Sequence, residues 1–228
     1  MKRSTINDII AAADEFISSF GFALPPFARW SPQDMQTRRQ DIDGIIEARL
    51  GWDITDYGAG DFTAMGLVLF TLRNGSLADL REGGGMCYAE KIMISRRDQV
   101  SPMHRHIIKT EDIINRGGAT LAIEMFESDG EGAIDRNAPV PVFCDAVPRI
   151  MQPGEVLRLA PGESVTLRPG NWHQFWGEGG DVLIGEVSTV NDDQTDNIFE
   201  QPIGRFADIE EDTRPSHLLV SDYDTWLR

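Results

Sequence analysis

Two histidines and a glutamate near the middle of the chain have types and spacing that suit a metal ion. His104 and His106 are separated by one residue, and Glu111 follows five positions after His106. Side chains alternate between the two faces of a β-strand, so both histidines point the same way if this stretch is extended. The four residues between His106 and Glu111 allow the chain to bend and bring the carboxylate to the same point. His173, from a distant segment, would complete a set of three imidazoles and one carboxylate.

Imidazole nitrogen and carboxylate oxygen are ligands of divalent first-row metals, here manganese, iron, zinc, cobalt or nickel. A single histidine in a strand is more often an ordinary polar residue than a ligand, and that alternative stays open for the H-x-H pair alone. The chain has one other histidine, His217, which we expect at the surface. The sequence therefore predicts a metal site made of His104, His106, Glu111 and His173.

The composition limits the partners of the chain. Its formal charge is −16, from 37 acidic and 21 basic residues, and this excess opposes binding to nucleic acid or to an anionic membrane. Cysteine is scarce, and no apolar stretch reaches the length of a membrane span. We therefore expect a cytoplasmic protein in which Cys87 and Cys144 are free thiols.

Apolar residues recur at helical spacing in the first fifty residues. One stripe runs from Ile6 to Phe20 and stops before Gly21, and a second follows Ser31, the expected N-cap, and ends at Gly51. We expect these two helices to pack against the rest of the chain or against a second subunit. The second alternative predicts a homodimer.

From about residue 60 the sequence consists of short apolar runs separated by glycine, proline or acidic turns. Turn signals such as Asn74-Gly75 and Pro161-Gly162 indicate antiparallel strands, and many short strands of this kind predict a sandwich or closed barrel. The runs span residues 66–72, 90–95, 120–126, 140–143, 155–159, 164–167 and 181–187. At 228 residues we predict a single domain with a helical extension (1–58), a barrel (59–190) and a tail packed on the barrel (191–228).

The two histidine segments resemble the two motifs of the cupin superfamily. The first resemblance rests on His104, His106, Glu111, Gly117 and Gly118, and the second on Gly162, Pro169, Gly170 and His173. Asp98 and Gly177 depart from the family pattern at turns. Over its whole length the chain looks like a D-lyxose isomerase. That resemblance implies a mainly β fold, a cupin jelly-roll β-barrel with N-terminal α-helices, with manganese as the preferred metal. It also implies aldose–ketose isomerisation of an unphosphorylated sugar.

Isomerisation moves a proton between C1 and C2, so a second group must carry it. Lys109 lies two residues before Glu111, and a metal nearby would lower its pKa; a solvated surface lysine is the alternative. Glu186 lies within the apolar run 182–187, where a buried carboxylate would need a partner. We predict Glu186 as the general base and Lys109 as the second candidate, with a weaker case for Glu124.

Other residues could contact the sugar. Trp172 and Phe175 flank His173, and one of them could stack on a sugar face, although such aromatic residues belong to the core more often than not. Arg205 and the pair Asp192-Asp193 could bind hydroxyl groups if the tail closes over the barrel mouth, and a solvated loop is the alternative.

Three functions are compatible with the same ligands. A metal-dependent isomerase would interconvert D-lyxose and D-xylulose, with D-mannose and D-fructose as a second pair. A dioxygenase would use iron or nickel at the same site, and a non-catalytic sugar-binding barrel would use the metal only to hold its fold. The resemblance favours the isomerase.

Overall fold

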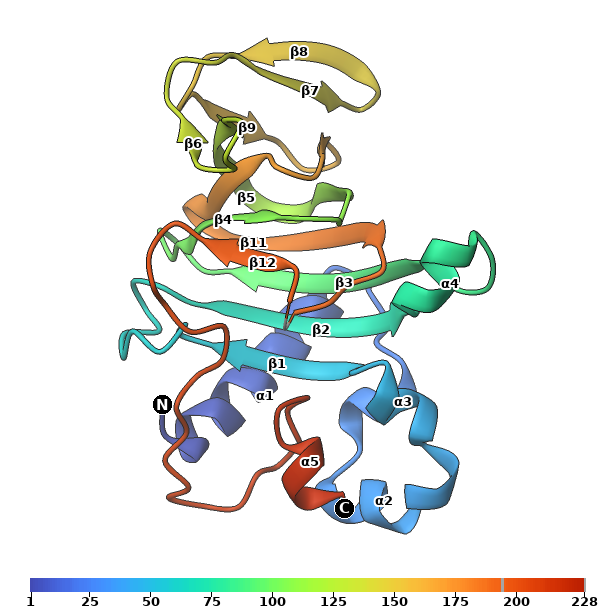
Figure 1. Ribbon diagram of the computed structural model, residues 1–228. Helices are drawn as coiled ribbons and strands as arrows, with labels where there is room; N and C mark the ends of the chain where they lie inside the picture. The colour runs from blue at the N-terminus through green and yellow to red at the C-terminus, as the bar shows by residue number, and fades with distance from the viewer. Residues whose placement is uncertain (194, 228) are drawn as a thin grey trace.

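Two long antiparallel strands organise the fold. In the computed structural model, which describes residues 1–193 and 195–227, β5 (Glu111–Ser128) pairs with β11 (Trp172–Thr189) along most of its length (Figure 1). Their register shifts between Glu178 and Val182, close to Gly118 and Gly179, whose φ angles are +95° and +83°. Each strand therefore has two halves with different neighbours.

The first half of β5 and the second half of β11 lie in the middle of a large sheet. Its strand order is β1-β2-β3-β11-β5-β10-β7-β8. The further strands of this path are β1 (Gly51–Thr55), β2 (Leu67–Asn74), β3 (Tyr88–Ser95), β7 (Val140–Cys144), β8 (Val147–Met151) and β10 (Ser164–Leu167).

The second half of β5 and the first half of β11 have other neighbours. Here β4 pairs with β11 and with β12, while β9 and β6 pair with β5. These strands are β4 (Ser101–His106), β6 (Ile134–Asp135), β9 (Val156–Leu159) and β12 (Asn197–Phe199). The described strands pair antiparallel and the sheet is not closed, and the predicted mainly β fold is confirmed.

The inner faces of these strands form the main core, which includes Leu121, Ile123, Val165 and Ile184. The outer face of β1–β3 is covered by α1 (Arg3–Ser19), whose stripe of buried isoleucines packs on Val68, Phe70 and other sheet residues (Figure 1). The first predicted helix is therefore confirmed, and its stripe from Ile6 to Ile17 packs within the chain, whereas Phe20 is exposed.

The second predicted helix is broken. Ser31 is its N-cap, as predicted, and forms a reciprocal capping box with Asp34. The helix ends at Thr37, however, and the segment continues through other short pieces because threonine, aspartate and glycine are weak helix formers. The pieces of this region are η1 (Pro26–Arg29), α2 (Pro32–Thr37), η2 (Arg39–Asp41) and α3 (Asp43–Glu47).

Several elements were not predicted, among them β1, α4 (Leu77–Glu82) and β8. β1 begins at Gly51, so the expected helical extension 1–58 already contains the first strand of the sheet. The short helix α4 connects β2 to β3.

The tail follows the surface of the molecule. After β12 it runs along the α1 side to α5 (Tyr223–Trp226), beside α2 and α3 (Figure 1). Arg3 of α1 bonds Asp222 and Glu211, which fixes the tail to the first helix. No helix in the described part of the chain is long and apolar enough to cross a membrane.

Candidate metal centre and active-site pocket

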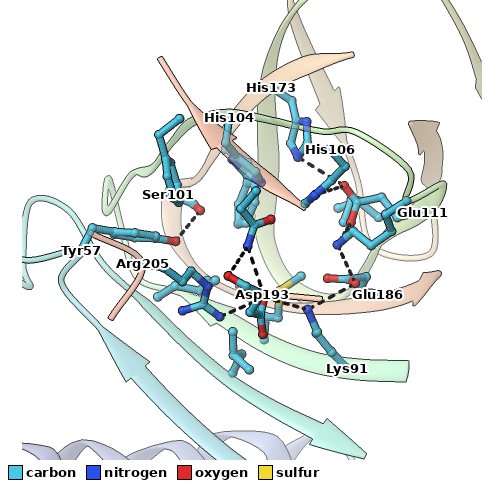
Figure 2. A pocket seen from close by; sticks show the side chains of 18 residues that line it. Tyr57, Lys91, Ser101, His104, His106, Glu111, His173, Glu186, Asp193 and Arg205 are labelled. Atoms are coloured by element: carbon cyan, nitrogen blue, oxygen red, sulfur yellow. Dashed lines mark hydrogen bonds and ion pairs between the residues drawn. The ribbon is translucent and has the colours of Figure 1, made fainter. Parts of the chain in front are cut away.

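Three histidines from two strands meet on the inner side of the sheet. His104 and His106 lie on β4, and His173 lies near the start of β11, directly opposite His104. One ring nitrogen of each histidine lies within 4.8 Å of the others, and Figure 2 shows the three rings turned toward one another. The H-x-H spacing on an extended strand thus produces one cluster with a third histidine from the neighbouring strand.

Backbone carbonyl groups orient two of these rings. Nδ1 of His104 lies 2.8 Å from the Pro102 carbonyl oxygen, and Nδ1 of His173 lies 3.1 Å from that of Asn171. A carbonyl oxygen only accepts hydrogen bonds, so each Nδ1 carries the proton and each Nε2 keeps its lone pair. Metal-binding histidines are oriented in the same way.

Glu111, the first residue of β5, adds a carboxylate to the cluster. Its Oε1 lies 3.2 Å from Nε2 of His106 and 3.3 Å from Nε2 of His173. Within residues 1–193 and 195–227 this buried oxygen has no hydrogen-bond donor. A buried carboxylate oxygen is costly unless something neutralises it. Nitrogen lone pairs and an unpartnered carboxylate oxygen that converge on one point fit a divalent metal.

The charge states of these groups also suit a metal. Burial and the neighbouring histidines hold the pKa of His104 well below its usual range, and burial lowers the pKa of His173 to about 4. Burial would raise the pKa of Glu111, but Lys109 and His106 outweigh it and hold that pKa well below its usual range. Neutral imidazoles and an ionised carboxylate are the forms that bind metals.

Lys109 joins Glu111 to Glu186. Its Nζ lies 2.7 Å from Oε2 of Glu111 and 3.0 Å from Oε1 of Glu186, and all three side chains are buried. Burial opposes the charge of Lys109, but the two carboxylates outweigh it and raise the pKa of Lys109. This direction is opposite to the lowering that we expected from the sequence, because both carboxylates contact the ammonium directly.

Ion pairs of alternating sign continue from Glu186 across the pocket (Figure 2). Nζ of Lys91 lies 3.5 Å from Oε1 of Glu186 and 3.8 Å from Oδ1 of Asp193. Nη2 of Arg205 lies 3.3 Å from the same Asp193 oxygen and 2.9 Å from Oδ2 of Asp53. We call this series the ion-pair row; its members are Glu111, Lys109, Glu186, Lys91, Asp193, Arg205 and Asp53.

The rest of the pocket wall is apolar or carries hydroxyl groups. Leu67, Met93 and Phe199 line it, and the Tyr57 hydroxyl lies 2.8 Å from that of Ser101. Burial raises the pKa of Tyr57 to about 12, so its hydroxyl keeps its proton at neutral pH. Charged and hydroxyl groups around a small enclosed space suit a small ligand rich in hydroxyl groups.

The structure brings most of the predicted site residues together. His104, His106, Glu111, His173, Lys109, Glu186, Phe175 and Arg205 all line this one pocket. Arg205 reaches it from the tail, as expected if the tail covers the mouth. Of the acidic pair, Asp193 lines the pocket, whereas Asp192 lies outside that lining and accepts a hydrogen bond from Thr195.

Trp172 lies away from the pocket. Its neighbour His173 faces inward, so Trp172 faces the other side of β11, where it packs with Met103 and Phe126. Its indole nitrogen donates a hydrogen bond to the carbonyl oxygen of Gly132. We therefore assign Trp172 to packing.

Two other predicted positions also lie outside the lining. Glu124 accepts a hydrogen bond from Gln174, which faces away from the inward-pointing His173. His217 contacts the hydroxyl of Ser216 near the surface, as expected.

Sequence reasoning missed Lys91, Asp53 and Tyr57. Lys91 and Asp53 each lie in a run of buried residues, in β3 and β1. A charged residue inside an apolar run is the signal that identified Glu186, and it would have found Lys91 as well. No comparable signal in the sequence marks Tyr57.

Comparisons with known proteins give the family of the chain. A model of the D-lyxose isomerase family matches residues 1–223. The chain is 48% identical to a D-lyxose/D-mannose isomerase of Serratia proteamaculans and 46% identical to one of Escherichia coli O157:H7. Each alignment covers 98% of this chain and 98% of the relative.

Solved structures give the same fold. The L-ribose isomerase of Acinetobacter sp. DL28, solved with L-ribose, matches with a TM-score of 0.62 at 14% identity, over 92% of this chain and 98% of that one. The L-ribose isomerase of Cellulomonas parahominis, solved with L-psicose, matches with a TM-score of 0.57 at 14% identity over the same shares. These neighbours confirm a cupin-like fold. Because a family model and two relatives match almost end to end, the chain belongs to the D-lyxose isomerase family.

Proposed function

We propose that this aldose–ketose isomerase interconverts D-lyxose and D-xylulose, and D-mannose and D-fructose as a second pair. The two curated relatives are named for D-lyxose and D-mannose, and their identity to this chain covers nearly its whole length. The observation that carries the proposal is the pocket itself, in which three histidines and Glu111 lie beside the buried Lys109–Glu186 pair. This arrangement offers a place for a metal and an acid–base group side by side.

We propose His104, His106, His173 and Glu111 as the ligands of a divalent metal, with manganese as the ion. Imidazole and carboxylate ligands accept manganese as well as zinc, cobalt, iron and nickel. When bound, such an ion supplies positive charge to the C1 and C2 oxygens of the open-chain sugar and so stabilises the negative charge that develops there.

Glu186 is the proposed general base. Its carboxylate removes the hydrogen of C2 from the aldose and returns it to C1, while one proton passes from the C2 oxygen to the C1 oxygen. Lys109 keeps its charge beside Glu186 and Glu111, because both carboxylates hold it within 3.0 Å. Its ammonium therefore bridges the two carboxylates and fixes their positions. Phe175 and Arg205 are the proposed contacts of the sugar chain, and Asp193 replaces Asp192 in that role.

Turnover of D-lyxose by chelator-treated protein tests this function. The measurement is made without oxygen, before and after manganese is added, with D-xylulose as the product detected. We expect no turnover without metal and recovery with manganese. Recovery that depends on oxygen would instead support a dioxygenase, and sugar binding without turnover by metal-loaded protein would support a non-catalytic barrel.

A homodimer and a cytoplasmic location stay predictions of the sequence. Most of the α1 stripe packs on the sheet of its own chain, whereas Phe20 at its end is exposed. Light scattering coupled to size-exclusion chromatography would measure the number of subunits.

A further inference from the structure

Lys91 is a buried cation for which the proposed reaction has no direct use. It lies on β3, directly opposite Glu186 in the register of β3 and β11, and its side chain is 4% exposed. Because paired residues on adjacent strands face the same side of a sheet, both side chains point into the pocket (Figure 2). A buried lysine is costly unless carboxylates or other acceptors surround it.

Two ammonium groups and one hydroxyl lie around a single oxygen of Glu186, and the hydroxyl of Ser188 also lies 2.8 Å from the carbonyl oxygen of Thr189, which competes for its one hydrogen. Nζ of Lys109 lies 3.0 Å from Oε1, the hydroxyl of Ser188 lies 3.1 Å from it, and Nζ of Lys91 lies 3.5 Å from it. These donors come from three different elements: the segment before β5, β11 itself and β3. All three of these contacts reach Oε1, so these groups hold the carboxylate at that oxygen.

The same ammonium of Lys91 also contacts the segment that follows β11. It donates a hydrogen bond to Oδ1 of Asn191 at 2.5 Å and lies 3.8 Å from Oδ1 of Asp193. Asp193 in turn pairs with Arg205, and both of these tail side chains line the pocket. Within the ion-pair row, Lys91 thus joins Glu186 to Asp193 of the tail; the backbone N–H of Lys109 makes a second contact with the tail, at Asp196.

We propose that Lys91 is a positioning residue for Glu186: it fixes Oε1, with Ser188 and Lys109, so that Oε2 is the oxygen that takes the proton from the sugar. Through Asn191 and Asp193 it also fixes the position of that oxygen relative to the tail. This inference rests on the proposed function, because it assumes that Glu186 is the base.

The test compares variants of the full-length, metal-loaded protein with D-lyxose and D-mannose as substrates. Lys91→Met removes the charge and keeps much of the length, Lys91→Arg keeps the charge, and Ser188→Ala removes the hydroxyl donor alone. The matched control is Glu90→Gln, the next residue on β3, whose carboxylate pairs with Arg73 on the opposite face. Metal content and thermal unfolding are recorded for each variant.

For Lys91→Met we expect kcat to fall roughly 10- to 100-fold with little change in KM, because a displaced base costs rate more than binding. Ser188→Ala has a smaller effect in the same direction. Lys91→Arg recovers most of the rate, and Glu90→Gln matches the wild type.

The pH profile separates positioning from a purely structural role. Burial raises the pKa of Glu186, but Lys109 and Lys91 outweigh it, so that pKa lies below its ordinary value. The groups that face Glu186 are Lys109 and Glu111 from the start of β5, Lys91 from β3 and Ser188 from β11. Loss of Lys91 removes one stabilising cation, so the acid limb of the kcat/KM profile moves to higher pH, by roughly one unit. In Glu90→Gln the acid limb of the profile stays at its wild-type pH.

Two results would overturn the positioning role alone. One is wild-type kcat and an unmoved acid limb in Lys91→Met. The other is a lower rate with an unmoved acid limb and a lower unfolding temperature, which indicates a structural ion pair. A wild-type protein that holds metal but isomerises neither sugar would overturn the proposed function and this inference together.

Discussion

At the scale of single residues, the site depends on which atom of each side chain is left free. His104 and His173 give their Nδ1 hydrogen to backbone carbonyl groups, and Glu111 gives one oxygen to Lys109 and turns the other toward the histidines. Each of these three proposed ligands thus has one atom engaged by the protein and one available to an ion, whereas Nδ1 of His106 has no hydrogen-bond partner among the described residues. That division fixes the orientation of the ligands before any ion binds.

Replacing a ligand should remove metal and activity together. For His173→Ala we expect a loss of bound metal and a fall in turnover of at least about 100-fold, because one of the proposed ligands is lost. Atomic emission spectroscopy on the purified variant measures the metal, and D-xylulose formation measures turnover. His217→Ala, near the surface, is the control and should keep both. Full metal content in His173→Ala would remove it from the ligand set.

Replacing the base should separate activity from metal content. Glu186→Gln keeps the shape of the side chain but cannot accept the C2 proton, so we expect turnover to fall by about 100- to 10,000-fold. Its contacts are with Lys109, Lys91 and Ser188, so metal content should stay near that of the wild type. Glu124→Gln is the matched control, because its carboxylate bonds Gln174 outside the pocket. Wild-type turnover in Glu186→Gln would show that another group carries the proton.

At the scale of elements, the bend shared by β5 and β11 brings the site together. The first half of β5 carries Glu111 and the second half of β11 carries Glu186, whereas His173 lies in the other half of β11. If the two strands were straight, His173 and Glu186 would lie far apart along β11. Because the strands bend at their glycines, all three side chains line one pocket.

A side chain at the bend should therefore be costly. Gly118 has φ of +95°, and a Cβ there would lie 2.3 Å from the carbonyl oxygen of Asp181. For Gly118→Ala we expect the free energy of unfolding to fall by about 2 to 4 kcal/mol, from backbone strain plus this clash. Gly179→Ala is the matched control, since its φ is +83° but nothing lies within 4 Å of the added Cβ.

Strain alone predicts a loss of about 1 kcal/mol for Gly179→Ala. Urea denaturation of both variants gives the two free energies. Equal losses would mean that the close approach to Asp181 relaxes without cost and that only the φ angle matters at the bend.

At the scale of the whole molecule, one buried arginine joins the first helix to the tail. Arg3 is fully buried and bonds Asp222, whose side chain is 9% exposed, and Glu211, whose side chain is 49% exposed. Burial opposes its charge, but Glu211 and Asp222 outweigh burial and raise the pKa of Arg3. This contact spans almost the full length of the chain.

Removing that charge should weaken the whole fold. In Arg3→Met, Asp222 is left as a buried charge without its partner, and we expect the free energy of unfolding to fall by about 3 to 5 kcal/mol. Adding Asp222→Asn should recover part of the loss, because the remaining charge is removed too. Urea denaturation of the single and double variants checks both statements. A double variant as unstable as Arg3→Met would show that packing, and not charge, is what Arg3 supplies.

Much of this architecture follows from local patterns. The α1 stripe, the Ser31 cap and the apolar runs of β2, β3, β7, β9 and β10 are visible as periodicity and turn signals. β5 and β11 were seen only as their apolar parts, because glycines and polar residues interrupt each strand at the bend. β1 was missed because a five-residue strand with Asp53 at its centre gives no alternating pattern.

The site was predicted where its residues lie close in the sequence. His104, His106, Lys109 and Glu111 fall within one short segment, and the cupin resemblance adds His173. Glu186, Arg205 and the pair Asp192-Asp193 were also named as candidates, whereas Lys91 was not, because only the register of β3 with β11 brings it to Glu186. Trp172 shows the converse, since its place beside a ligand in the sequence puts it on the opposite face of the strand.

The pairing of β4 has a consequence for how the protein is made. β4 carries two of the histidines, and its partners are β11 and β12, which follow much later in the chain. During translation β4 is therefore made before either partner strand, and its backbone N–H and C=O groups are unpaired until both partners follow. Such unpaired strand edges are sites of wrong pairing between nascent chains. We therefore expect the cluster of His104, His106 and His173 to form only after β11 has been synthesised.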